Sequence, residues 1–111
     1  MRLSPLDPLR WTFFVGMSFA NMKARRFGEA IDWADRSLRE QPRNAAAYRL
    51  KAVACAHLDR TKEARECVRR VLELQPAFTI SGWQRTIGAF VGTPETLAMW
   101  VDGLRKAGLP E

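Results

Sequence analysis

A period of 34 residues is the feature that most constrains how this 111-residue chain can fold. Two stretches of the chain match at this spacing. The matching pairs are Glu29 and Glu63, Ala30 and Ala64, Leu38 and Leu72, Gln41 and Gln75, and Pro42 and Pro76. Ala98 and Pro110 continue the series toward the C-terminus, and Pro8 continues it toward the N-terminus. A fixed period of this length is typical of arrays in which each unit is one supersecondary element that neighbouring units help to bury.

Each unit is predicted to hold two helices. In the second unit Leu50, Ala54 and Leu58 are spaced by four residues, which places them on one side of a helix. Small residues stand where two helices would approach most closely, and they are Ser18, Ala30, Ala52 and Ala64. A plain helical bundle with accidental spacing is the alternative, although a bundle needs no fixed period.

This pattern resembles the tetratricopeptide repeat over residues 11 to 78, and more weakly over 79 to 110. The match departs from the family where Asn21 replaces an aromatic residue and Lys51 replaces a leucine. Arg25 and Asp59 also stand where the family has a glycine between the helices. The resemblance implies an all-α, right-handed solenoid of α-hairpins, with a single domain over residues 1–111. Its units would be a first repeat at 8–42, a second at 45–76, and a degenerate capping pair at 79–107.

Helices are expected at 8–23, 27–41, 45–58, 61–75, 79–90 and 94–107. Thr93 followed by Pro94 is typical of a helix start, and Gly108 with Pro110 of a helix end. Asp7 and Pro8 give a similar start to the first helix.

The resemblance also implies a binding groove, because the first helix of each tetratricopeptide pair lines a concave surface. By alignment the groove residues are Val15, Phe19, Lys23, Arg49, Val53, His57 and Trp83. An apolar floor with cationic points suits an extended or helical peptide that carries an acidic group. The expected function is therefore non-catalytic protein or peptide binding. The alternative for Val15, Phe19 and Leu50 is packing against neighbouring helices or a second subunit.

The first predicted helix is apolar on nearly every side, and such a helix is usually buried. The sequence therefore predicts either that the chain continues a longer protein or that it pairs with a second copy as a homodimer. The residues expected to mediate self-association are Trp11, Phe13, Phe14 and Met17.

The two ends carry a narrower resemblance. Residues 3–8 and 101–111 resemble the C-terminal repeat region of bacterial class III adenylate/guanylate cyclase proteins, in which a catalytic domain precedes a repeat array. This implies a part of, or an accessory to, a bacterial signalling protein. The metal-binding aspartates of cyclase chemistry sit on strands, and no strand pattern occurs in this sequence.

The charge balance raises a second function class. The chain has 18 basic residues, of which 14 are arginines, against 12 acidic residues, for a net charge of +6. This balance would attract nucleic acid. Asp59, Glu63, Glu66 and Glu73 are interleaved with the basic clusters, however, and that pattern favours a charged helix exterior. A basic helical nucleic-acid-binding protein remains the alternative.

The sequence offers little for catalysis or cofactors. Cys55, His57 and Cys67 do not have the spacing of a metal site, and no glycine-rich phosphate loop or nucleophile elbow occurs. We expect no enzyme activity, no cofactor and no metal. The apolar stretch at 11–20 is about half the length of a membrane span, and Pro5 and Pro8 before it favour a helix start over a secretion signal. A cytoplasmic protein with reduced thiols is expected.

Overall fold

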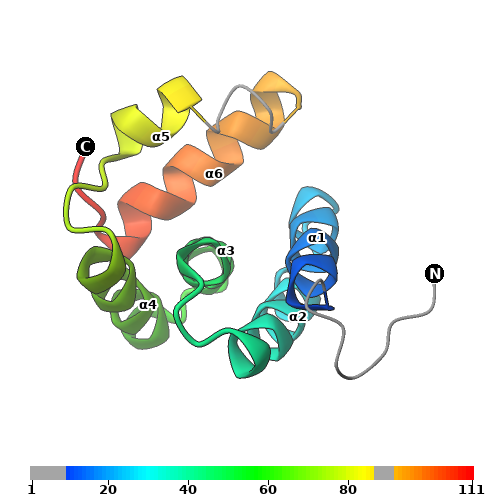
Figure 1. Cartoon of the computed structure of the whole chain (residues 1–111). Helices are drawn as coiled ribbons and strands as arrows, with labels where there is room; N and C mark the ends of the chain where they lie inside the picture. Colours follow the sequence, from blue (N-terminus) through cyan, green and yellow to red (C-terminus); the bar gives the residue numbers. More distant parts are fainter. Residues whose placement is uncertain (1–9, 87–91) are drawn as a thin grey trace.

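The structure of this chain is a computed structural model that describes residues 10–86 and 92–111, and these form six α-helices (Figure 1). The helices are α1 (Arg10–Lys23), α2 (Phe27–Glu40), α3 (Ala45–His57), α4 (Thr61–Leu74), α5 (Ile80–Thr86) and α6 (Pro94–Ala107). The predicted all-α class is confirmed, and no strand occurs in these two ranges. The expected helix at 79–90 is described only as α5, and the start signal at Asp7 and Pro8 lies outside the described residues.

Side-chain and glycine caps set several helix ends. The Asn44 Oδ1 atom accepts a hydrogen bond from the Ala46 amide at 3.1 Å, which caps the start of α3. Thr93 caps α6 by accepting from the Thr96 amide at 3.2 Å, with Pro94 in the first turn as predicted. Gly108 ends α6 with φ of 100°, a conformation that glycine adopts at little cost.

The 34-residue period reappears in the turn between the helices of each hairpin. Arg25 and Asp59 both adopt left-handed backbone, with φ of 60° and 59°. The amide of Arg26 donates to the Asn21 carbonyl at 2.8 Å, and the amide of Arg60 donates to the Cys55 carbonyl at the same distance. The turns that join α1 to α2 and α3 to α4 therefore have one conformation, although neither contains the glycine that the left-handed position favours.

The small residues at matched positions lie at helix crossings. Ala30 and Ala64 are each 1% exposed, and Ser18 and its counterpart Ala52 are fully buried. The Ser18 hydroxyl donates to the Ala30 carbonyl at 2.7 Å, so α1 and α2 approach closely at this point. α1 to α4 thus form successive antiparallel neighbours, each packed on the one before it (Figure 1).

The third helix pair departs from the period. Ala98, which is 34 residues beyond Ala64, is exposed, whereas Ala64 is buried. α6 packs mainly against α3, and Figure 1 shows it between α5 and the hairpin of α3 and α4. Gly103 makes this approach possible, since a Cβ atom there would lie 2.5 Å from the Val53 Cγ1 atom. The position of α6 follows from this contact and was not predicted from the repeat.

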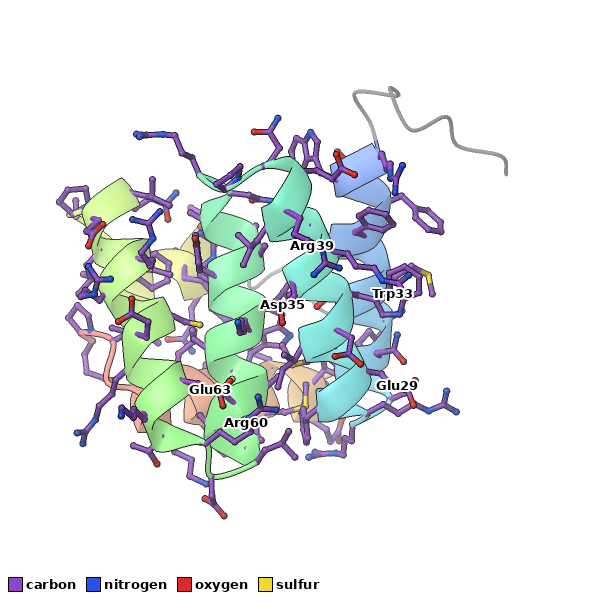
Figure 2. All side chains as sticks on the ribbon, turned by 90° about the horizontal axis from the view of Figure 1, so that it is seen from below. Glu29, Trp33, Asp35, Arg39, Arg60 and Glu63 are labelled. Atoms are coloured by element: carbon purple, nitrogen blue, oxygen red, sulfur yellow. The ribbon has the colours of Figure 1, made fainter. Side chains whose placement is uncertain are left out.

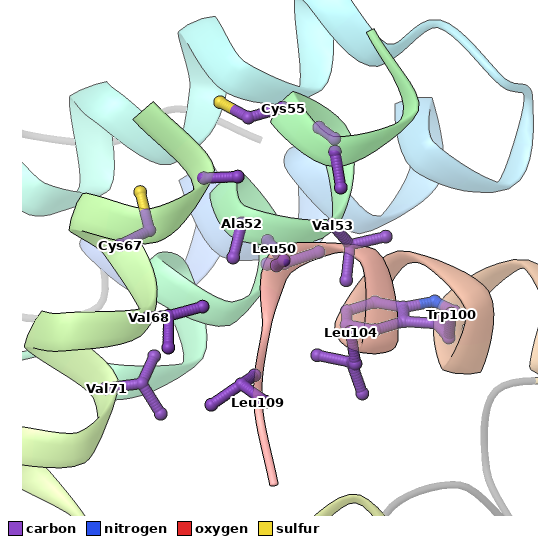
Figure 3. Close-up of a cluster of buried hydrophobic side chains, with 14 of the residues drawn as sticks. Leu50, Ala52, Val53, Cys55, Cys67, Val68, Val71, Trp100, Leu104 and Leu109 are labelled. Carbon is purple, nitrogen blue, oxygen red and sulfur yellow. The ribbon is translucent and has the colours of Figure 1, made fainter. Parts of the chain in front are cut away.

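One hydrophobic core joins α3, α4 and α6. Leu50, Val53, Val68, Leu104 and Leu109 lie together in it, as Figure 3 shows. The Cα radius of gyration is 13.2 Å, the value of a compact domain of about 100 residues. The arrangement is therefore a compact globule of antiparallel helical neighbours. Among the described helices, none has the length and apolar character that crossing a bilayer requires.

Candidate functional site

A buried arginine distinguishes the surface where α3 and α4 meet α5. Arg49 lies in the second turn of α3 and is only 8% exposed. Its Nη1 atom donates to the Gln75 Oε1 atom at 2.9 Å, and its guanidinium lies over the Phe78 ring, 5.6 Å from the centroid. No carboxylate among the described residues forms an ion pair with it. Arg49 is thus a buried cation whose partners here are a neutral amide and an aromatic ring.

Burial lowers the pKa of the Arg49 guanidinium, because the charged form is partly removed from water. Arginine nevertheless keeps its charge at neutral pH. A buried charge without a counter-ion is costly, and it is the kind of group that gains most when an anion binds beside it.

Two pockets adjoin the Arg49 side chain. The first, of about 500 Å³, is lined by Arg49 together with Trp11, Gln41, Arg43, Asn44 and Leu74. The second, of about 390 Å³, is lined by Arg49 together with Pro76, Phe78, Thr79, Trp83 and Thr86. Because Arg49 and Gln75 border both pockets, a ligand that enters either one meets the same guanidinium.

Local structure makes the region electropositive. The first turn of α3, which borders the first pocket, contains no acidic residue, so the positive end of the helix dipole is not neutralised there. Arg43 adds a second cation to the same pocket. Gln75 follows the last residue of α4 with φ of −136° and ψ of 76°, the turn conformation that Gln41 has after α2. This turn brings the Gln75 amide to Arg49.

The predicted groove residues are divided by α6. Val53 is fully buried and Trp83 is 4% exposed, and the Trp83 ring stacks on Trp100 of α6 at 5.2 Å between centroids. Phe19 is half-buried, with its ring 5.9 Å from that of Trp100. The inner surface of α1 and α3 is therefore occupied by the chain's own sixth helix. Of the predicted set, only Arg49 and Trp83 share a pocket.

His57 also has a structural environment. Its Nε2 atom lies 2.8 Å from the Met99 carbonyl oxygen, so it donates a hydrogen bond to α6. Its ring stacks on Phe27 at 4.8 Å with an interplanar angle of 14°. His57 therefore joins α2, α3 and α6. The remaining predicted groove residues lie elsewhere on α1, with Val15 half-buried and Lys23 exposed.

The residues expected to mediate self-association have different environments. Phe13 is 38% exposed and Met17 is half-buried, whereas Phe14 is largely buried. Trp11 is half-buried, lines the first pocket beside Arg49, and its carbonyl accepts from the Ser37 hydroxyl at 3.1 Å. The first helix is thus covered on part of its surface and open around Phe13.

Sequence reasoning named Arg49 but missed Gln75 and Phe78 as residues of the same site. Both lie in the turn around Pro76, where no helical spacing shows which way a side chain points. Their distance from Arg49 by 26 and 29 residues carries no periodic signal either. The available hint was Gln75 itself, whose repeat to Gln41 marks a turn of fixed geometry.

The two cysteines are buried and free. Burial raises the pKa of the Cys55 thiol and raises the pKa of the Cys67 thiol to about 12. Neither thiol is an activated nucleophile, because reactive cysteines have lowered pKa values. Within residues 10–86 and 92–111, no three His, Cys, Asp or Glu side chains are grouped as metal ligands.

Comparison of this chain with protein-family models, curated proteins and solved structures finds no match. The functional argument therefore depends on the geometry around Arg49 and on the charges of the surrounding residues.

Proposed function

We propose that this chain is a non-catalytic protein-interaction module that binds an acidic group of a partner protein or peptide at Arg49. The observation that carries the proposal is the buried Arg49 guanidinium, which adjoins two pockets and has no carboxylate partner among the described residues. A carboxylate is the complementary group, since a charge-assisted bond to a guanidinium is about twice as strong as a neutral hydrogen bond.

The proposed fold at finer detail is an array of tetratricopeptide-like hairpins with a degenerate third pair. The equal turn geometry at Arg25 and Asp59 supports this, as do the equally buried Ala30 and Ala64. In this proposal α6 folds back over the inner surface of α1 and α3. The ligand site then lies at the edge of the array, beside the start of α3 and the end of α4.

The second pocket would receive an apolar side chain next to the acidic group. Phe78 and Trp83 supply aromatic walls, and Thr79 and Thr86 supply hydroxyl groups. Binding by a few apolar anchors around one charged contact is common in peptide recognition. The resemblance of residues 3–8 and 101–111 to cyclase repeat regions suggests a bacterial signalling protein as the context, although residues 3–8 lie outside the described residues.

Nucleic-acid binding is the alternative function, and the ion pairs argue against it. Arg60, Arg69 and Arg70 of the basic clusters each pair with a glutamate on α4. Phosphate contacts would have to replace these pairs. A tight complex with generic DNA or RNA that weakens steeply with salt would favour the alternative.

Selection of a random peptide library on the 111-residue protein, followed by calorimetric titration of the enriched peptides, tests the proposal. We expect enriched peptides to carry Asp, Glu or a free C-terminal carboxylate next to an apolar residue. Arg49→Met should weaken their binding by about thirtyfold or more, because one partner of a buried charge pair is removed. Arg65→Met is the matched control, since Arg65 is exposed on α4, and it should leave the affinity unchanged. Enriched peptides without an acidic group, or equal affinity for the Arg49 variant, would contradict the proposal.

A further inference from the structure

We infer that a second copy of this chain docks on the outer face of the first hairpin, about a two-fold axis that sets α2 antiparallel to the α2 of the other copy. This surface, here called the outer α2 face, consists of Phe13, Glu29, Asp32, Trp33, Arg36 and Arg39. It is distinct from the pockets around Arg49.

The repeat shows that this face corresponds to a docking surface. In the second hairpin, Ala47 and Cys67 are 0% and 3% exposed. Lys51 lines the same small pocket as Cys67 and pairs with Asp35 of α2 at 2.7 Å, so this side of the second hairpin is the one that faces the first. The residues 34 positions earlier than Ala47 and Cys67 are Phe13 and Trp33. The surface that receives a neighbour in the second hairpin is thus open in the first.

Large aromatic rings fill these open positions. The Phe13 and Trp33 rings meet edge to face at 6.1 Å between centroids, and Phe14 lies 5.7 Å from Trp33. Figure 2 shows Trp33 on the side of α2 opposite to Asp35, which faces α3. Phe13 remains 38% exposed and Trp33 half-buried. Aromatic residues are enriched at protein interfaces, while alanine and cysteine suffice where another hairpin already covers the site.

The charges along α2 identify the occupant as a second copy. Glu29 and Asp32 precede Trp33, and Arg36 and Arg39 follow it, all within one side of the helix. None of these four forms an ion pair with another described residue, whereas α4 pairs its charges within the helix. The outer α2 face therefore has an acidic half and a basic half.

The spacing of these charges is self-complementary. Glu29 and Arg39 lie five residues on either side of Ala34, and Asp32 and Arg36 lie two residues on either side of it. An antiparallel copy centred level with Ala34 sets Glu29 opposite Arg39 of the second copy, and Asp32 opposite Arg36. Two-fold symmetry makes each pair occur twice, which is the property of an isologous interface.

Charge reversal tests both the contact and its direction. Sedimentation velocity between 1 and 500 μM (orders of magnitude set by weak self-association, about μM to mM) should show a monomer–dimer equilibrium. Glu29→Arg alone and Arg39→Glu alone should each weaken the dimer by about tenfold, because two attractive pairs become repulsive. The double variant, and an equimolar mixture of the two single variants, should restore association, since each again brings opposite charges together.

Arg65→Glu on α4 is the matched control and should leave the dimer constant unchanged. Circular dichroism would show that the exposed substitutions keep the helical fold. Trp33→Ala should abolish the dimer. A monomer at every concentration overturns the inference, and so does a dimer that ignores both reversals or that the double variant fails to restore. A parallel or unrelated contact would give the last result.

Discussion

Gly103 of α6 and Val53 of α3 are in such close contact that a Cβ atom at residue 103 would lie 2.5 Å from the Val53 Cγ1 atom. Carbon atoms in favourable contact are about 3.5–4.0 Å apart. The His57 Nε2 atom would also lie 3.2 Å from the added carbon. A glycine inside a helix costs about 0.5–1 kcal/mol relative to alanine, so its presence here reflects the close approach of α6 to α3.

We therefore expect Gly103→Ala to lower the free energy of unfolding by about 1–3 kcal/mol, the usual cost of overpacking a filled core. Urea denaturation followed by circular dichroism measures the change. Gly16→Ala in α1 is the control, because no atom lies within 4 Å of the added carbon, and it should stabilise the protein by up to about 1 kcal/mol. In Gly103→Ala combined with Val53→Ala, the two losses should add to less than their sum. Full additivity would show that α6 does not press on Val53.

The turns at Arg25 and Asp59 offer a second prediction. Both residues hold a left-handed backbone, which strains a residue with a Cβ atom. Arg25→Gly should raise the free energy of unfolding by about 0.5–1 kcal/mol, and Asp59→Gly by less, since aspartate tolerates this conformation better. Arg26→Gly, at a φ of −93°, is the control and should be neutral or destabilising. Destabilisation by Arg25→Gly would mean that the Arg25 side chain contributes more than its backbone strain costs.

Much of the fold could be predicted from local spacing. The helix limits of α1 to α4, the cap at Thr93 and the stop at Gly108 all follow from residues that act within one or two turns of their own position. The direction of α6 could not be predicted, because it depends on shape. The mid-helix Gly103 was the visible signal of a close contact, but only a three-dimensional arrangement shows that Val53 and His57 are the contacting residues.

The same limit applies to the candidate site. Arg49 was recognisable as a cation on the first helix of a pair, and its place in a groove was a prediction from the resemblance. Its burial, its bond to Gln75 and its contact with Phe78 depend on how α4 ends. Val53 and Trp83 were placed in the groove by the same alignment, and α6 covers them because the third helix pair does not follow the period.

Arg49 should also trade stability for binding. Replacing a buried charge that lacks a counter-ion by an apolar side chain of similar length is often stabilising. We expect Arg49→Met to raise the free energy of unfolding by about 1 kcal/mol while it removes the binding of acidic peptides. Arg65→Met, at an exposed position, should change stability by less than about 0.5 kcal/mol. A marked loss of stability in Arg49→Met would instead assign Arg49 to holding α3 against the end of α4.

The buried thiols predict how stability depends on pH. Burial, the main cause, raises the pKa of Cys67 to about 12 in the folded chain, while an ordinary thiol titrates near the reference value of 9.0. Between these two values the unfolded chain loses the thiol proton and the folded chain keeps it, so stability falls as pH rises. Each unit of pH above 9.0 should remove up to about 1.4 kcal/mol through this thiol. Below this range the contribution is fully present and does not vary.

Urea denaturation at pH 8, 9 and 10 (about one unit on either side of the thiol's ordinary pKa) measures this dependence against Cys67→Ala as the matched variant. Cys67→Ala will be less stable at every pH because it leaves a cavity, but it should lose less stability as pH rises. Cys55, whose pKa burial also raises, still contributes in that variant, so the double variant with Cys55→Ala should show the shallowest slope. Equal slopes in all three proteins would mean that the thiols ionise as readily in the folded chain as in the unfolded one, and that water reaches the space between α3 and α4.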